Sequence, residues 1–150
     1  MSEILIREAA GADLQAVIDL TGVWEAENIT FGLRKDTPED LEGCRIWVAQ
    51  EEGGRIVGFA AGREDVYKRK SSVLVENEKY FEIEELYVLP ETRSQGIGDM
   101  LFKRAEEHAR AAGYRHILLS TATKDTMAML RFYVEKQEMQ VWSMRLFKDL

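Results

Sequence analysis

The chain has little of what disulfide-bonded, membrane-spanning or nucleic-acid-binding proteins need. Cys44 is the only cysteine, so no disulfide forms within the chain and a reducing compartment is expected. No apolar run approaches the length that spans a bilayer, and the first residues lack the basic and apolar segments of a signal peptide. The formal charge of −7 argues against general nucleic-acid binding. These absences predict a cytoplasmic protein that contacts neither membrane nor nucleic acid.

What the chain does contain is enough for an ordinary core. It has 150 residues, of which 45% are hydrophobic, and this size and composition predict one domain over residues 1–150. No linker, internal repeat or low-complexity run divides it. The negative charge is compatible with a cationic small-molecule partner, although net charge more often reflects solubility.

Apolar spacing and turn residues predict an alternating series of strands and helices. Hairpins come first and two crossover units follow, which predicts an α/β (α+β) fold with a mixed, mostly antiparallel twisted sheet and helices on both faces. We expect strands at residues 4–8, 45–50, 55–62, 80–89, 116–120 and 141–147, a further strand at 73–75, and helices at 11–24, 37–43, 96–113 and 125–135.

The most informative stretch runs from Leu86 to Gly98, where a strand is followed by a glycine-rich entrance to an amphipathic helix. N–H groups at a helix start lack intrahelical partners, and the helix dipole adds partial positive charge there. Glycines let an anion approach this backbone closely, so the segment predicts a phosphate-binding site.

Two common phosphate-binding motifs do not fit this stretch. A P-loop requires Lys followed by Ser or Thr after its last glycine, whereas Asp99 and Met100 follow Gly98. A dinucleotide fingerprint requires a small residue where Leu101 stands, and it belongs in the first strand–helix unit of a chain. Neither motif explains the turn.

A third pattern does fit. Arg93-x-x-Gly96-x-Gly98 after a strand that ends in Val88-Leu89-Pro90 resembles the pyrophosphate loop of the GNAT superfamily of acetyl-CoA-dependent N-acetyltransferases. Residues 83–88 (Ile-Glu-Glu-Leu-Tyr-Val) and 130–136 (Leu-Arg-Phe-Tyr-Val-Glu-Lys) are similar to that family at matching positions. The alternative, a glycine turn that only starts a structural helix, would not explain three matching segments in order. The resemblance implies a GNAT-type fold and acetyl-CoA as cosubstrate.

The resemblance also implies two catalytic side chains. An alkylamine titrates near ~10, so a general base assists its attack at neutral pH, and Glu84 matches the glutamate proposed for this role in similar enzymes. Regular alternation puts Glu82, the reserve candidate, on the same face as Glu84 and puts Glu85 on the other, unless a bulge intervenes. These glutamates could instead be solvated charges. Tyr133 matches the helix tyrosine that protonates the departing thiolate, and its alternative role is aromatic packing.

Cofactor contacts implied by the resemblance are mainly to the backbone. The main chain of Leu86, Tyr87 and Val88 would meet the acetyl-pantetheine arm, and one N–H freed there by a bulge could polarise the thioester carbonyl. The pyrophosphate would lie on the amides of Ser94, Gln95, Gly96, Ile97, Gly98 and Asp99, with Arg93 nearby, and Ser120 and Thr121 could touch the arm. The chain departs from the family pattern at Ser94, where glycine is frequent, and at residues 137–139, which lack an expected glycine.

Together these features predict transfer of an acetyl group from acetyl-CoA to a primary amine of a small molecule or peptide, by direct attack in a ternary complex. Acidic residues at 25, 27, 82, 84 and 85 could attract a cationic amine, and the stretch from Trp24 to Asp36 falls where similar enzymes build the acceptor site. His108 and His116 lack ligand spacing, so no metal site is expected. The rival functions are a non-catalytic acyl-CoA-binding regulatory module and a protein-interaction domain. A homodimer is compatible with the resemblance, because similar enzymes are often dimers.

Overall fold

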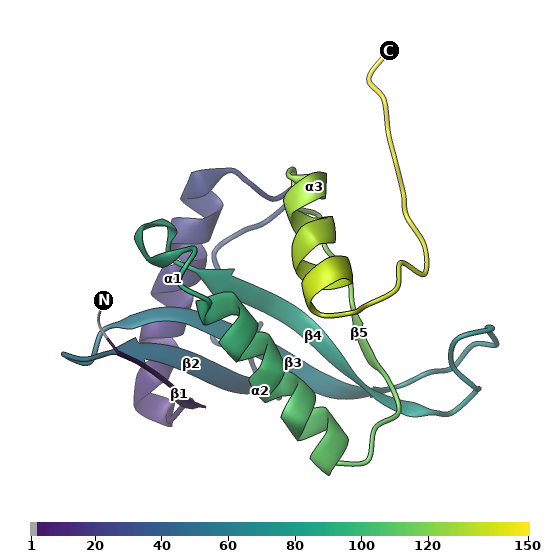
Figure 1. Cartoon of the computed structure of the whole chain (residues 1–150), viewed down its shortest axis with the longest axis horizontal. Helices are drawn as coiled ribbons and strands as arrows, with labels where there is room; N and C mark the ends of the chain where they lie inside the picture. Colours follow the sequence, from purple (N-terminus) through teal and green to yellow (C-terminus); the bar gives the residue numbers. More distant parts are fainter. Residues whose placement is uncertain (1–2) are drawn as a thin grey trace.

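A computed structural model describes residues 3–150 and shows one mixed sheet of five strands in the order β1-β2-β3-β4-β5 (Figure 1). Neighbours are antiparallel except β4 and β5, which run parallel. The predicted mixed, mostly antiparallel sheet is therefore confirmed. The strands are β1 (Ile4–Glu8), β2 (Arg45–Glu51), β3 (Ile56–Val66), β4 (Lys79–Val88) and β5 (Ile117–Leu119).

Helices cover both faces of this sheet, as predicted (Figure 1). On one face, Trp24 stacks on Tyr87 of β4 with ring centroids 5.0 Å apart. On the other face, His108 lies 5.2 Å from the ring of Phe81. The helical elements are a 3-10 turn (Gly11–Asp13) leading into α1 (Leu14–Glu27), a 3-10 turn (Pro90–Thr92), α2 (Ile97–Ala111), and α3 (Thr126–Met129) continuing into the π-helix η3 (Leu130–Lys136).

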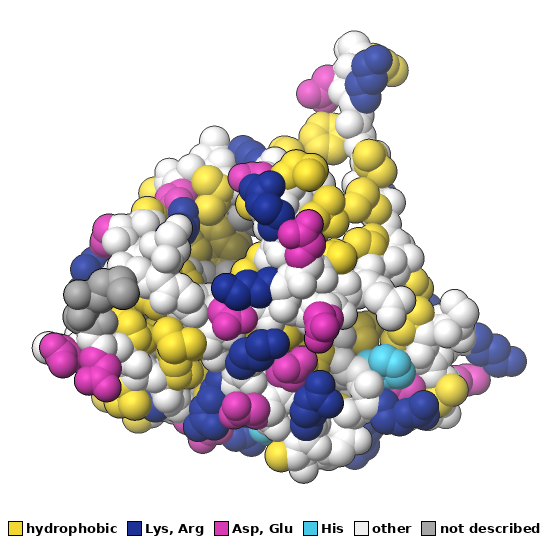
Figure 2. Space-filling model, in the orientation of Figure 1, with side chains coloured by type: hydrophobic (Ala, Val, Ile, Leu, Met, Phe, Trp, Pro, Cys, Tyr) yellow, Lys and Arg dark blue, Asp and Glu magenta, His cyan; other side chains and the backbone are white. Residues whose placement is uncertain are grey.

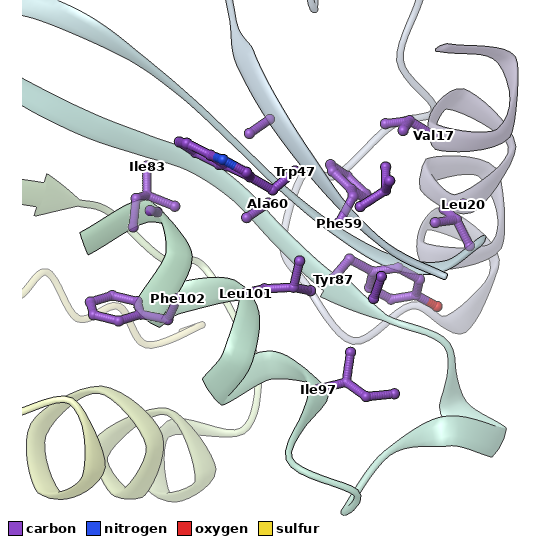
Figure 3. Packing of buried hydrophobic residues seen from close by; sticks show 14 of the residues in the cluster. Val17, Leu20, Trp47, Phe59, Ala60, Ile83, Tyr87, Ile97, Leu101 and Phe102 are labelled. Atoms are coloured by element: carbon purple, nitrogen blue, oxygen red, sulfur yellow. The ribbon is translucent and has the colours of Figure 1, made fainter. Parts of the chain in front are cut away.

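The core lies between these helices and the sheet (Figure 3). Val17 and Leu20 of α1 pack on one side, and Leu101 and Phe102 of α2 pack on the other. Residues 57–61 of the central strand β3 are all buried. A strand covered on both faces reads as a continuous apolar run rather than an alternating one, and burial of this run holds the two helix layers together.

Most predicted elements are present, and three are wrong. The segment 37–43 forms successive turns instead of an α-helix, because the N–H groups of Asp40, Leu41 and Glu42 donate to carbonyls three residues back rather than four. No strand forms at 73–75, where the Ser71 hydroxyl accepts hydrogen bonds from the N–H groups of Val73 and Leu74 and closes a turn. The strand expected at 141–147 is also absent, since these residues are extended but unpaired.

Gly62 of β3 allows the tightest backbone approach in this sheet. A Cβ at this position would lie 2.5 Å from the Glu82 carbonyl oxygen and 2.6 Å from the Phe81 ring. We expect Gly62→Ala to lower the free energy of unfolding by about 1–3 kcal/mol, as overpacked sites do, in urea denaturation. Gly11→Ala is the matched control, because a Cβ there meets nothing within 4 Å. Equal stability of the two variants would contradict this steric assignment.

Candidate active site

A cavity of about 250 Å³ opens at the point where β4 and β5 part. Only Phe81–Ile83 of β4 pair with β5, so the rest of β4 has no neighbour on that side. The walls come from α1, the following loop, β4, the end of β5 and η3. They comprise Trp24, Thr30, Phe31, Gly32, Leu33, Ile83, Glu84, Glu85, Leu86, Leu119, Ser120, Thr121, Ala122 and Tyr133.

A β-bulge at Glu84 shapes the floor of this cavity. Ala61 of β3 pairs with Glu85, whereas the next residue, Gly62, pairs with Ile83, so Glu84 has no partner across the ladder. An extra residue in one strand reverses the alternation of side chains beyond it. Accordingly, Phe81 before the bulge faces α2, and Tyr87 beyond it faces α1.

The bulge corrects the face assignment that regular alternation gave to the three glutamates. Alternation alone would put Glu85 on the sheet face opposite Glu82 and Glu84. With the bulge, Glu84 and Glu85 both line the cavity. The reserve candidate, Glu82, does not line it. Burial and the nearby carboxylates of Glu84 and Asp65 raise the pKa of Glu82.

Glu84 is held by Arg63 of the neighbouring strand β3 and by Cys44, the residue before β2. Its Oε1 lies 2.7 Å from Arg63 Nε, an ion pair, and its Oε2 accepts a hydrogen bond of 3.2 Å from Arg63 Nη2. The Cys44 thiol donates to the same oxygen over 3.6 Å. Burial and the Glu84 charge raise the pKa of Cys44 to about 11. Arg63 and Cys44 thus orient the Glu84 carboxylate, while Cys44 keeps its proton at neutral pH.

Glu85 lies next to a second acidic side chain. Burial, together with Asp36 beside it, raises the pKa of Glu85 well above its usual range. Asp36 Oδ2 is itself buried and has no other hydrogen-bond donor. A protonated Glu85 would supply that donor, so the two carboxyl groups are expected to share one proton at neutral pH.

This raised pKa predicts a pH dependence of folding. The folded chain keeps a proton on Glu85 that the unfolded chain releases above pH ~4.3, so the free energy of unfolding falls as the pH rises from there. We expect Glu85→Gln to raise the melting temperature by roughly 5 °C near about pH 8 and to lose this gain near about pH 4. Glu52→Gln, in an exposed turn, is the control. A pH-independent gain would contradict the assignment.

Tyr133 reaches the cavity from η3, where the helix is wound in the wider π form. Such turns are rare and often lie at functional sites. Burial raises the pKa of Tyr133 to about 12, so the hydroxyl stays protonated. Burial is the one cause of this shift, and no hydrogen bond within residues 3–150 contributes to it. The neighbouring ring of Phe132 lies 3.5 Å from the Cβ position of Gly98, which connects η3 to the glycine-rich turn.

The glycine-rich turn presents a row of free backbone donors. None of the N–H groups of residues 94–99 donates a hydrogen bond to another part of the described chain. Ser94 and Gly96 both have left-handed backbones, with φ of 65° and 81°. Alternation of this kind gathers N–H groups into an anion-binding concavity, and the α2 dipole points at it. A Cβ at Gly96 would meet nothing within 4 Å, so the space above the turn is open.

The Arg93 side chain turns away from this row and towards α1. Its guanidinium donates hydrogen bonds of 2.9 and 2.7 Å to Glu27 and one of 3.0 Å to the Val88 carbonyl. The Tyr87 hydroxyl also donates to Glu27, and both burial and that carboxylate raise the pKa of Tyr87. This network ties α1 to the end of β4. The predicted contact of Arg93 with pyrophosphate stays a prediction.

The predicted backbone contacts border the gap between the strands. The stretch from Leu86 to Val88 pairs with β3 on one side only. Ser120 and Thr121 follow β5 directly and line the cavity across from Leu86. The opposite wall is held by the loop after α1, whose Phe31 N–H donates to the Ala122 carbonyl over 2.9 Å.

Sequence reasoning did not identify Arg63, Asp36 or the position of Cys44. One signal was available. A hairpin with its turn at 51–54 pairs the strand at 45–50 with the strand at 55–62, so the residue before Arg45 lies opposite the residue after Gly62. The observed pair Arg45–Gly62 places Cys44 and Arg63 next to each other in this way. No comparable pattern marks Asp36, which lies in an irregular loop.

Within residues 3–150, no three histidine, cysteine or acidic side chains come together in a way that could hold a metal ion. No helix in the same range is both long and apolar enough to cross a membrane. His116 bonds to Glu78 instead, which lowers the pKa of that carboxyl.

Comparisons with known proteins agree with this geometry. The model of the acetyltransferase (GNAT) family matches residues 15–139. A Trypanosoma brucei acetyltransferase structure is 21% identical, with a TM-score of 0.71, over 99% of this chain and 100% of that one. The structure of a Bacillus halodurans transcriptional regulator is 23% identical, with a TM-score of 0.72, over 99% of this chain and 100% of that one. The structure of an aminoglycoside N-acetyltransferase in complex with CoA is 16% identical, with a TM-score of 0.73, over 100% of this chain and 96% of that one. At these identities the structures show a shared fold. No curated protein matches the chain.

Proposed function

The chain belongs to the acetyltransferase (GNAT) family, and from this premise we propose that it transfers acetyl from acetyl-CoA to a primary amine by direct attack in a ternary complex. The observation that carries the proposal is the cavity between β4 and β5, which has Glu84 and Tyr133 in its walls. The free N–H groups of residues 94–99 lie at the start of α2. The Phe132 ring of η3 lies close to Gly98 in that turn.

The backbone around the cavity offers separate places for the pyrophosphate and for the pantetheine arm of CoA. Residues 94–99 would hold the phosphates through their unpartnered N–H groups, and the left-handed Gly96 leaves room for a close approach. Leu86, Tyr87 and Val88 would bind the arm along the unpaired side of β4, facing Ser120 and Thr121. When bound there, acetyl-CoA supplies an acetyl group activated as a thioester.

Glu84 is the proposed general base. A general base must lie where the amine arrives, and the Glu84 carboxylate lines the cavity and is oriented by its ion pair with Arg63. Glu85 is a poorer candidate because it holds a proton at neutral pH. Glu82 is poorer for a different reason, since it does not line the cavity. Glu84 would remove the proton from the amine directly or through a water molecule.

Tyr133 is the proposed acid that protonates the departing thiolate. Burial raises the pKa of Tyr133 to about 12, so its hydroxyl keeps its proton across the working pH range. Direct attack is favoured over a covalent acyl-enzyme because Cys44, the only thiol, is protonated and held between Arg63 and Glu84. A protonated thiol is a poor nucleophile.

The acceptor side of the cavity favours a cationic amine. Trp24 and Phe31 provide aromatic walls beside the carboxyl groups of Glu84 and Glu85, a combination that binds ammonium groups. Glu27 is less available for this purpose, because it already accepts hydrogen bonds from Arg93 and Tyr87. Polyamines, aminoglycosides and lysine side chains share the required chemistry.

The test is an acetyl-CoA consumption screen over polyamines, amino acids, aminoglycosides and peptides, with each product identified by mass spectrometry. We expect turnover with at least one class of cationic amine and none with the matching alcohol. Calorimetry with CoA is run in parallel. CoA binding without turnover on any amine would favour the non-catalytic regulatory module instead. Absence of CoA binding would overturn both the acetyltransferase and the regulatory-module hypotheses.

A further inference from the structure

Gln137, the residue directly after η3, is buried although its side chain is polar. Only 4% of it is exposed. Its Nε2 donates a hydrogen bond of 2.8 Å to Asp99 Oδ1, in the first turn of α2. Because a carboxylate oxygen accepts and the amide nitrogen donates, this bond fixes which way the amide points. The end of the helix that carries Tyr133 is thereby joined to the glycine-rich turn.

The same amide leaves one acceptor unsatisfied inside the protein. Within residues 3–150, Gln137 Oε1 is buried and has no hydrogen-bond donor. A buried polar atom without a partner destabilises the folded state, so an apolar side chain of similar length, such as methionine, would suit the fold better. The bond to Asp99 is the favourable polar contact that this side chain makes.

Asp99 lies three residues after Gly96, the residue that caps α2. An acidic side chain at this place can reach back to the N–H of the capping residue. The chain itself shows such a bond at its first 3-10 turn, where Asp13 Oδ2 accepts from the Ala10 N–H over 2.7 Å. Without the bond from Gln137, we expect the Asp99 side chain to reach the Gly96 N–H in the same way.

No cation takes the place of Gln137 beside this carboxylate. Figure 2 shows cationic and acidic side chains side by side over the outer face of α2. Lys103, one helical turn beyond Asp99, lies with its Nζ 3.8 Å from Glu106 Oε1. Within residues 3–150, the bond from Gln137 is the one hydrogen bond or ion pair of the Asp99 side chain.

We propose that Gln137 is a positioning residue for the cofactor, which holds the Asp99 side chain away from Gly96 and keeps the N–H row of residues 94–99 open to the pyrophosphate of CoA. This role rests on the proposed function, because it takes CoA as the anion at the turn. A carboxylate of the same chain would compete with a phosphate for the same donors. The free N–H groups at residues 94–99 are the state that the bond maintains.

The first test is Gln137→Met, which removes the donor and keeps the length of the side chain. We expect the dissociation constant for CoA, measured by calorimetry, to rise about 10-fold, the scale of one hydrogen bond at a helix start. In steady-state kinetics the KM for acetyl-CoA should rise by the same factor while kcat is unchanged. Gln137→Leu removes the same donor with a differently shaped side chain and should give the same result. Gln140→Met, at an exposed position, is the matched control.

A double-mutant cycle with Asp99→Ala tests whether Gln137 acts through this carboxylate. Alanine has no side-chain acceptor, so in that background Gln137→Met should leave the dissociation constant for CoA unchanged. A deficit that persists there, or a fall in kcat without a rise in KM, means that Gln137 acts through the fold and overturns the proposal. A parent that binds no CoA overturns the proposed function itself. Equal CoA affinity in the parent and in Gln137→Met overturns only the role of Gln137.

Discussion

Replacing Glu84 by glutamine is expected to lower kcat/KM for the acceptor amine by about 10²–10⁴-fold at neutral pH, the usual cost of losing a general base. Glutamine keeps the size of the side chain and can still accept a hydrogen bond from Arg63. It cannot take a proton from an ammonium group. The measurement is the initial rate of CoA release as a function of pH, with the amine that the screen identifies.

The pH profile separates catalysis from structure in this variant. An alkylamine loses its own proton near pH ~10, so Glu84→Gln should recover activity as the pH rises towards that value. A variant that is merely misfolded would not recover. Glu82→Gln is the matched control, because that carboxylate lies two residues away and outside the cavity. An unchanged rate in Glu84→Gln, or a deficit that is equal at every pH, would exclude Glu84 as the base.

The sheet and the glycine-rich turn could be predicted from sequence because their signals are local. The turn contains Gly96 at a position that requires a left-handed backbone, and glycine adopts this backbone at little steric cost. The apolar run at 57–61 marks a strand that is buried on both faces. In both places the residue type at a position reports the local structure directly: glycine marks the left-handed backbone, and a continuous apolar run marks the strand buried on both faces.

The site itself depends on features that local patterns do not carry. The bulge at Glu84 is a property of the pairing between β3 and β4, and it decides which carboxylates line the cavity. Asp36 changes the protonation of Glu85 from a loop distant in sequence. The resemblance supplied Glu84 and Tyr133 as candidates. Only the folded chain brings Arg63 and Cys44 to the first of them.

The prediction at 141–147 failed for a different reason. Its alternating pattern is that of a strand, but a strand also needs backbone partners, and within residues 3–150 no strand forms backbone hydrogen bonds with this segment. Glu138 takes a left-handed backbone at a place where the resemblance led us to expect a glycine. Such a backbone costs a non-glycine residue about 1–2 kcal/mol.

Replacing Tyr133 by phenylalanine is expected to lower kcat by about 100-fold, the low end for loss of a general acid. The low end applies because an alkyl thiol has a pKa of about 8.5 and its thiolate can leave without full protonation. The ring remains to pack against Phe102 and Phe132, so the melting temperature should change little. The measurement is steady-state kinetics with acetyl-CoA together with calorimetry for CoA.

Two readouts distinguish an acid from a packing residue in this variant. CoA affinity should be unchanged, because the proposed cofactor contacts are to the backbone of residues 86–88 and 94–99. In the parent enzyme, kcat should not fall with rising pH until the hydroxyl of Tyr133 ionises, at a pKa of about 12. Tyr114→Phe is the matched control, since that hydroxyl bonds to Glu64 outside the cavity. If Tyr133→Phe retains full kcat, the thiolate leaves without help from this residue and η3 serves only to close the cavity.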